Sequence, residues 1–170
     1  MDDGKVIETQ TARTYTRDFA KFGEFTYSDA DVMTFPWGLP GFPQLRKYIV
    51  LSLPEQKNFV WLQSIDDMKV ALPLVDPWSI FSDYDPQLPP YAIISLEIER
   101  PEEFVVLCVT VVTHNREEMS VNLRAPIVVN LRTMTGRQVT LENAKYSIRT
   151  EVPRHHETPT IEGEAEEVLG

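Results

Sequence analysis

The stretch Ser120–Asn130, SVNLRAPIVVN, sets apolar residues beside polar and turn-forming ones. Two earlier stretches share this character: FPWGLPGF at Phe35–Phe42 and ALPLVDPW at Ala71–Trp78. Short apolar runs interrupted by Pro, Gly, Asn or Asp are typical of strands separated by turns. None of the three stretches contains a plausible arrangement of catalytic groups. They therefore predict a β-protein whose function depends on its packing and its surface.

Further short apolar runs lie around these stretches, with turn signals between them. We predict a strand that begins near Phe22, Phe25 and Tyr27, and further strands at Val32–Phe35, Tyr48–Leu53, Phe59–Ile65, Lys69–Val75, Phe104–Thr113, Met119–Leu123, Ile127–Leu131 and Gln138–Leu141. The chain shows no internal repeat and no second hydrophobic core. We expect an all-β fold over residues 20–150: a single small antiparallel β-barrel or sandwich-like domain with short helical turns.

Three segments carry more specific expectations. Phe104–Thr113 is the longest apolar, β-branched run and is predicted to be the central strand, with Cys108 as a small core residue. Pro73 cannot donate a hydrogen bond to a β-ladder, which favours an edge position or a bulge. The apolar residues of Tyr91–Ile98 suit either a short helix or a strand.

The two ends of the chain differ in composition from its centre. Residues 1–19 are polar and lack sustained periodicity, so we expect a flexible arm there. Residues 151–170 contain six glutamates against Arg154, a net charge of −5, which indicates an acidic disordered tail. No signal peptide and no run near the ~20 apolar residues of a membrane helix is visible. We expect a cytoplasmic protein without a membrane partner.

The charge and the titratable residues argue against nucleic-acid binding and catalysis. The net charge of −10 opposes binding to a phosphate backbone. His114 lies near two glutamates in a predicted turn, and His155 and His156 have no nearby cysteine, so we expect neither a metal nor any other cofactor. The acid pairs Asp66-Asp67 and Asp83…Asp85 lie among turn residues, where aspartate is favoured for local hydrogen bonding. We expect no enzymatic activity.

The order of the motifs resembles the flagellar assembly factor FliW family. The resemblance covers about Phe22 to Arg149 and includes the Phe35–Phe42 loop, the strand Phe59–Ser64, Val75-Asp76-Pro77 and Asn122–Asn130, followed by Gly136–Val139 and Tyr146–Arg149. It implies a short helix at Tyr91–Ile98. Residues 1–19 and the Glu-rich tail after Val152 have no counterpart in the family pattern.

The resemblance also implies a function in flagellum biogenesis. A FliW-type protein acts as a chaperone that binds flagellin in the cytoplasm before export. Once flagellin is secreted, the freed factor binds the translational repressor CsrA and relieves its block on flagellin synthesis. The implied partners are therefore flagellin and a CsrA-type repressor, with no direct contact to nucleic acid.

Partner-binding residues are expected at two places. Trp37, Leu39 and Phe42 supply large apolar side chains in the Pro/Gly-rich loop, and Asn122, Arg124 and Pro126 interrupt an apolar stretch at a predicted sheet edge. A purely structural alternative is open for both polar residues. Asn122 can bond a neighbouring loop backbone, and Arg124 can simply cover the surface.

The alternative function is that of a small β-barrel that binds nucleic acid or a carbohydrate. Trp37, Trp61 and Trp78 are aromatic residues of the kind on which bases and sugars stack. The negative charge and the lack of a basic aromatic stripe argue against it.

Overall fold

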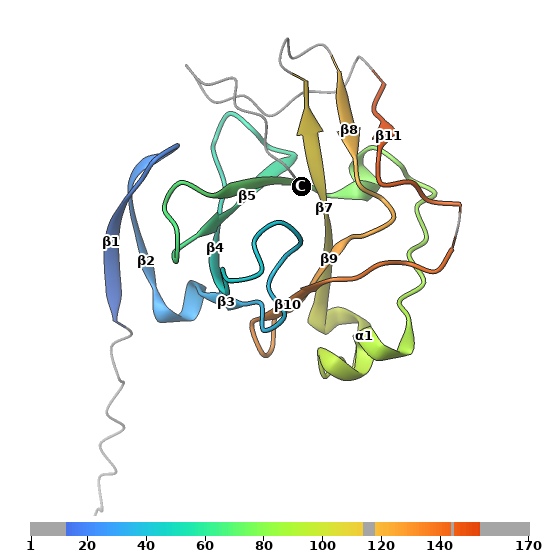
Figure 1. Cartoon of the computed structure of the whole chain (residues 1–170), viewed down its shortest axis with the longest axis horizontal. Coiled ribbons are helices and arrows are strands. Elements are labelled where there is room, and N and C mark those ends of the chain that lie inside the picture. The colour runs from blue at the N-terminus through green and yellow to red at the C-terminus, as the bar shows by residue number, and fades with distance from the viewer. Residues whose placement is uncertain (1–12, 114–117, 144, 154–170) are drawn as a thin grey trace, which may run out of the picture.

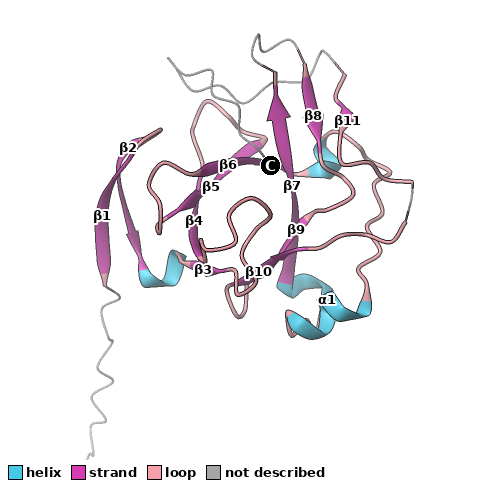
Figure 2. Cartoon of the chain, viewed as in Figure 1, coloured by secondary structure: helices cyan, strands magenta, loops and turns pink. Residues whose placement is uncertain are grey.

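Most of the predicted strands pair in a closed ring, which Figures 1 and 2 show end-on. The computed structural model describes residues 13–113, 118–143 and 145–153. Within these, one nine-stranded sheet follows the order β11-β8-β7-β6-β5-β4-β3-β10-β9, and an additional pairing of β7 with β9 closes it. The strands of the sheet are β3 (Met33–Thr34), β4 (Lys47–Leu51), β5 (Phe59–Ser64), β6 (Ala71–Val75), β7 (Phe104–Val112), β8 (Met119–Val121), β9 (Ile127–Asn130), β10 (Thr135–Gln138) and β11 (Thr150–Glu151).

Strand β7 holds the ring together, as expected for the central strand. Its first half pairs with β9 and its second half with β6 and β8, all antiparallel. The prediction of a small all-β antiparallel barrel is confirmed, with one difference: β10 meets β3 in parallel, at Thr135 and Thr34. Pro73 lies in β6 within the sheet, not at its edge. It is tolerated there because the pairing of β6 with β7 begins only at Leu74.

The barrel interior is one of three apolar clusters. It contains Phe35, Leu39, Leu45 and Tyr48 together with inward-facing residues of β5, β6, β7 and β9. Leu39 comes from the loop between β3 and β4, which lies across the centre of the ring in Figure 2. This loop therefore closes one end of the barrel with its own side chains.

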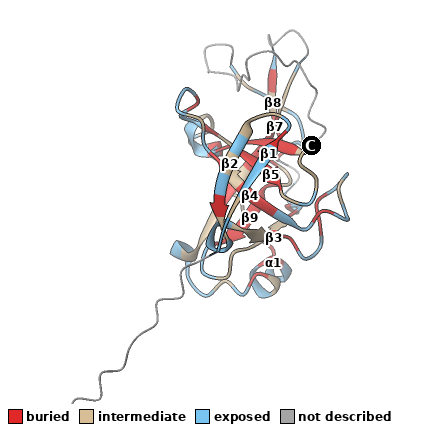
Figure 3. Ribbon diagram, turned by 90° about the vertical axis from the view of Figure 1, so that its left-hand side faces the viewer, coloured by how far each residue is buried: buried red, intermediate tan, exposed pale blue. Residues whose placement is uncertain are grey.

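The other two clusters cover the outside of the barrel. The hairpin of β1 (Thr14–Phe19) and β2 (Gly23–Ser28) packs Phe19 and Tyr27 against Ile49, Leu51 and Trp61. On another side, β8, β9 and the helix α1 (Pro90–Ser95) enclose a cluster that includes Ala92, Leu96 and Cys108. Figure 3 shows buried residues gathered in the sheet and mainly exposed ones along the hairpin. The helix at α1 and the core position of Cys108 agree with the sequence predictions.

Three boundary predictions are corrected. The predicted flexible arm is wrong for Thr14–Phe19, which form β1, because Tyr15 and Phe19 reach the cluster under the hairpin. Residues 1–12 lie outside the described part. The predicted tail overlaps β11 at Glu151, and residues 154–170 are likewise outside the described part. The strand predicted at Gln138–Leu141 lies earlier, at Thr135–Gln138, and shares only Gln138 with the predicted range.

No helix in the described ranges has the length and apolar character needed to cross a membrane.

Candidate partner-binding site

The loop that closes the barrel holds Trp37 at the surface. Phe35 and Leu39 on either side of it are buried in the barrel. Gly38 has φ +66°, and a Cβ there would lie 2.5 Å from the Pro43 carbonyl oxygen, so the chain turns tightly at this point. Arg46 donates hydrogen bonds to the carbonyls of Pro36 and Pro43. These contacts fix the loop and leave the Trp37 side chain in solvent.

Arg137 lies between two aromatic rings. Its guanidinium is 4.4 Å from the Trp37 ring centroid and 4.7 Å from that of Tyr91, and its Nη1 donates to Ser95 Oγ at 3.0 Å. Strand β10 fixes its position, because the adjacent Gly136 lies against Phe35 so closely that a Cβ would be 2.5 Å from that ring. Three segments distant in the sequence thus meet in one stacked arrangement.

Polar contacts fix α1 against the β9–β10 turn. Asn130 Nδ2 donates to the carbonyls of Leu96 and Glu97 at 2.8 and 3.3 Å, and Arg132 Nη2 donates to the Glu97 carbonyl at 2.8 Å. Arg132 also forms an ion pair with Glu103 at 3.4 Å. These bonds satisfy carbonyls at the end of a short helix, which otherwise lack partners. The helix therefore presents Tyr91 and Ile94 in a fixed position.

We call the surface made by Trp37, Tyr91, Ile94 and Arg137 the aromatic–arginine patch. Its apolar members are unusually accessible: Ile94 is 74% exposed, Trp37 48% and Tyr91 42%. Large apolar side chains that gather on a surface mark an interaction site more often than scattered ones do. Tryptophan, tyrosine and arginine are also the residues most enriched at energetic hot spots of interfaces.

The structure distributes the six predicted site residues unevenly. Trp37 belongs to the patch. Leu39 is buried in the barrel and Phe42 packs against the same cluster, so both support the loop from inside. Pro126 is also buried, and its carbonyl accepts a hydrogen bond from the Val139 amide.

The two predicted places lie on either side of β10. Asn122 Oδ1 accepts a hydrogen bond from the Ala125 amide at 2.9 Å, which is the local structural role that the sequence left open. Arg124 is half-buried. Gln138 of β10 donates to the Ala125 carbonyl at 3.0 Å, while its neighbour Arg137 stacks on Trp37. Strand β10 therefore connects the predicted edge to the loop.

Sequence reasoning missed Tyr91, Ile94 and Arg137. A single apolar residue or arginine carries no signal of its own, because its role comes from the tertiary contacts that bring it beside Trp37. An available hint was the helix alternative for Tyr91–Ile98, which places Tyr91, Ile94 and Ser95 on one face.

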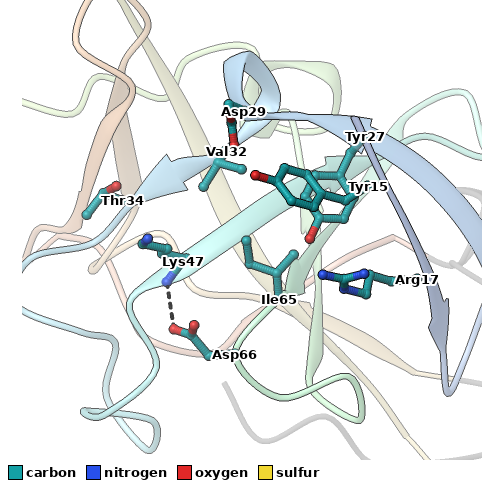
Figure 4. Close-up of a pocket in the computed structure, with 9 residues that line it drawn as sticks. All are labelled: Tyr15, Arg17, Tyr27, Asp29, Val32, Thr34, Lys47, Ile65 and Asp66. Carbon is teal, nitrogen blue, oxygen red and sulfur yellow. Dashed lines mark hydrogen bonds between the residues drawn. The ribbon is translucent and has the colours of Figure 1, made fainter. Parts of the chain in front are cut away.

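A second surface, the hairpin groove, has a volume of about 430 Å³ and lies between β1–β2 and the barrel (Figure 4). Tyr15 stacks on Tyr27 with 5.5 Å between ring centroids, and Arg17 lies 5.5 Å from the Tyr15 ring. Asp66 Oδ2 accepts hydrogen bonds from the backbone amides of Arg46 and Lys47 at 2.8 and 3.0 Å. The groups that line this groove are largely engaged in attaching the hairpin and the turns to the barrel.

The titratable side chains of the core are held in their neutral forms. Burial raises the pKa of the Cys108 thiol to about 12, and burial likewise raises the pKa of Tyr84, whose hydroxyl donates to the Leu123 carbonyl at 2.7 Å. A thiol with so high a pKa is a poor nucleophile. Among the described residues no group of three or more His, Cys, Asp and Glu side chains is placed to hold a metal ion. His114, Glu117, His155 and His156 lie outside them.

These features define a small all-β barrel domain with a loop across one end and aromatic residues displayed around an arginine. A sequence model described as FliW protein matches residues 17–152. The chain belongs to the FliW family.

Curated relatives and a solved structure agree with this assignment. The flagellar assembly factor FliW of Thermosipho africanus is 38% identical over 130 residues, which cover 76% of this chain and 90% of that protein. The flagellar assembly factor FliW of Clostridium tetani is 37% identical over 127 residues, which cover 75% and 88%. A crystal structure of the flagellar assembly factor FliW matches with a TM-score of 0.74 at 26% identity, over 81% of this chain and 96% of that one.

Proposed function

We propose that this chain binds flagellin in the cytoplasm and antagonises the translational repressor CsrA, and so couples flagellin synthesis to flagellin export. Membership in the FliW family supports a role in flagellar assembly. The observation that carries the binding role is the aromatic–arginine patch, which offers aromatic, aliphatic and cationic groups on a rigid support. The proposed role is stoichiometric binding and includes no catalysis.

A partner switch requires that the two partners weaken each other. Coupling between binding sites is typically about 1–3 kcal/mol, or roughly 5- to 150-fold in affinity. We propose that flagellin and the repressor use an overlapping surface, formed by the Pro36–Phe42 loop and the Asn122–Pro126 edge. Strand β10 contacts both places, with Arg137 over Trp37 and Gln138 at the Ala125 carbonyl. The acidic net charge favours rapid encounter with a basic, RNA-binding repressor.

Calorimetry with the two purified partners tests this proposal. Flagellin and the CsrA-type repressor of the same host are titrated separately into the full chain, and each complex is then titrated with the other partner. We expect binding to both, with each partner weakening the other at least fivefold. Binding to flagellin alone would reduce the role to that of a chaperone. Binding to neither partner contradicts the proposal.

The alternative function, binding of nucleic acid or a carbohydrate, requires the tryptophans to form one stacking surface. Their arrangement does not support such a surface. Trp61 is buried under the hairpin, where its Nε1 donates to Gln56 Oε1 at 3.0 Å. Trp78 is 41% exposed, and its Nε1 donates to the Tyr84 carbonyl beside the outer cluster. Trp37 alone of the three is part of the patch. Stacking of successive bases or sugars needs several accessible rings on one path.

A further inference from the structure

Arg137 has hydrogen-bonding capacity that the described part of the chain leaves unused. A guanidinium carries five N–H donors, and one of those of Arg137 has a partner there, the Ser95 hydroxyl. No described acid lies within ion-pair distance of it. The guanidinium lies over both the Trp37 and the Tyr91 ring, and its free N–H donors point outward from its edge. That edge matches the two oxygens of a carboxylate.

The neighbouring Arg132 shows that acids are available on this side of the barrel. It pairs with Glu103 at 3.4 Å and Glu99 at 4.0 Å, and it also bonds the Glu97 carbonyl. The fold thus gives Arg132 three oxygen partners and gives Arg137 two aromatic rings and a hydroxyl. An arginine fixed by stacking, with its edge unpaired, is arranged to accept an acidic group from another molecule.

We propose that Arg137 recognises a carboxylate on flagellin, and that Trp37, Tyr91 and Ile94 contact apolar side chains next to that carboxylate. This inference rests on the proposed function and adds to it the chemistry of the recognised segment. The apolar members of the patch exclude water once a partner docks. A charge-assisted, two-bond contact within such a rim is worth far more than one in open solvent.

Within the overlapping surface, charge assigns the part around Arg137 to flagellin over the repressor. The chain carries a net charge of −10, which attracts a basic RNA-binding repressor. A surface centred on an unpaired arginine is the least favourable place for a basic partner. The carboxylate therefore comes from the other partner of the switch.

The test compares two arginines that both stack on a tyrosine. Arg137→Lys keeps the positive charge but removes the planar guanidinium, and Arg137→Gln removes both. Arg17→Lys is the control, because it makes the Arg-to-Lys change over Tyr15 in the hairpin. We expect Arg137→Lys to weaken flagellin binding about tenfold or more and Arg137→Gln to weaken it further. Arg17→Lys should stay within about twofold of the wild type, and repressor binding should change less than flagellin binding in all three.

Unfolding by urea verifies that each variant is folded, and the Nε–H NMR resonance of Arg137 provides a direct readout. We expect this resonance to shift when flagellin is added to the wild-type chain. If both Arg137 variants bind flagellin at full strength, or if only repressor binding is lost, the inference is wrong. If wild-type flagellin binding itself is absent, the proposed function fails and this inference fails with it.

Two other occupants of the patch, a second copy of the chain and the chain's own glutamates, would give different results. If Arg137→Gln converts a dimer of the free chain to a monomer, the patch binds a second copy and the flagellin assignment is wrong. The chain also carries Glu164, Glu166 and Glu167 near its end. If their replacement by Gln in the full chain shifts the Arg137 resonance while flagellin does not, the carboxylate is the chain's own.

Discussion

The aromatic–arginine patch and the hairpin groove use the same residue types to different ends. In the groove Arg17 lies over Tyr15, but Tyr15 stacks on Tyr27 and the hairpin beneath is fastened by buried Phe19 and Trp61. In the patch the rings beside Arg137 are Trp37 and Tyr91, and both are largely exposed. Aromatic residues under the hairpin stabilise the fold, whereas those of the patch are displayed by it. What distinguishes the two is whether the fold covers the rings.

Replacing one tryptophan in each region by alanine tests whether the fold covers the ring, and it has the largest expected effect. Trp61→Ala removes a ring that is 4% exposed, so we expect it to lower the free energy of unfolding by about 3–5 kcal/mol. Trp37→Ala should lower it by less than about 1 kcal/mol, since it loses mainly the contact with Arg137. Urea unfolding measures both values, and calorimetry with flagellin measures binding.

The binding data complete that comparison. Binding is measured without urea, at a temperature at which Trp61→Ala is still folded. We expect Trp61→Ala to bind flagellin like the wild type and Trp37→Ala to bind at least tenfold more weakly. A Trp37→Ala variant that is destabilised as much as Trp61→Ala would show that the patch is part of the core.

Two glycines of the loop across the barrel test how tightly the loop is held against its own backbone. Gly38 and Gly41 both have positive φ, which costs an alanine about 1–2 kcal/mol. Only at Gly38 would the added Cβ also meet the Pro43 backbone, at 2.5 Å. We therefore expect Gly38→Ala to lower the free energy of unfolding by about 2–5 kcal/mol and Gly41→Ala by about 1–2 kcal/mol. Equal urea midpoints for the two variants would contradict this account of how the loop is fixed.

An exposed isoleucine inside the patch can be compared with one outside it. Ile94 is 74% exposed beside Tyr91, and Ile148 is 60% exposed in the segment before β11. Ile94→Glu removes an apolar contact and supplies a carboxylate that competes for Arg137, so flagellin binding should weaken about tenfold or more. Ile148→Glu should leave it within about twofold. A loss of binding in both variants would indicate repulsion by charge in general and no specific patch.

The sequence predicted the barrel because its strands are short, apolar and separated by turn residues. Phe104–Val112 could be identified as the central strand from its β-branched run alone. The parallel contact of β10 with β3 could not be predicted, because a single pairing leaves no periodic signal. Strand β1 was missed for a related reason. Its inward positions are Tyr15, Arg17 and Phe19, and the arginine hides the alternation.

The patch was only partly predictable. Trp37 could be selected because a tryptophan in a Pro/Gly-rich loop is often displayed. Leu39 and Phe42, selected by the same argument, point toward the barrel, since the loop folds back over its opening. Arg137 and Tyr91 lie far from Trp37 in the sequence, and their contact arises only after α1, β10 and the loop have docked.

The smallest expected effect concerns Arg132, the paired arginine next to Arg137. The hydrogen bond from the Glu99 amide, aided by Arg132, lowers the pKa of Glu103 below its usual 4.5. A carboxyl whose pKa is lower in the folded protein stabilises it above the unfolded pKa, and this contribution is lost as the pH falls through the folded value. We expect Glu103→Gln to make stability fall slightly less steeply below about pH 4.5, as measured by urea midpoints against pH, with its exposed neighbour Glu102→Gln as the control.

The same variant also tests which arginine faces flagellin. Glu103→Gln leaves Arg132 without its nearest acid but does not touch the Trp37–Arg137–Tyr91 stack. If Arg137 is the recognition residue, flagellin affinity at neutral pH should stay within about twofold of the wild type, because a freed surface ion pair contributes little. A tenfold change in either direction would move the binding surface toward Arg132 and remove the contrast between the two arginines.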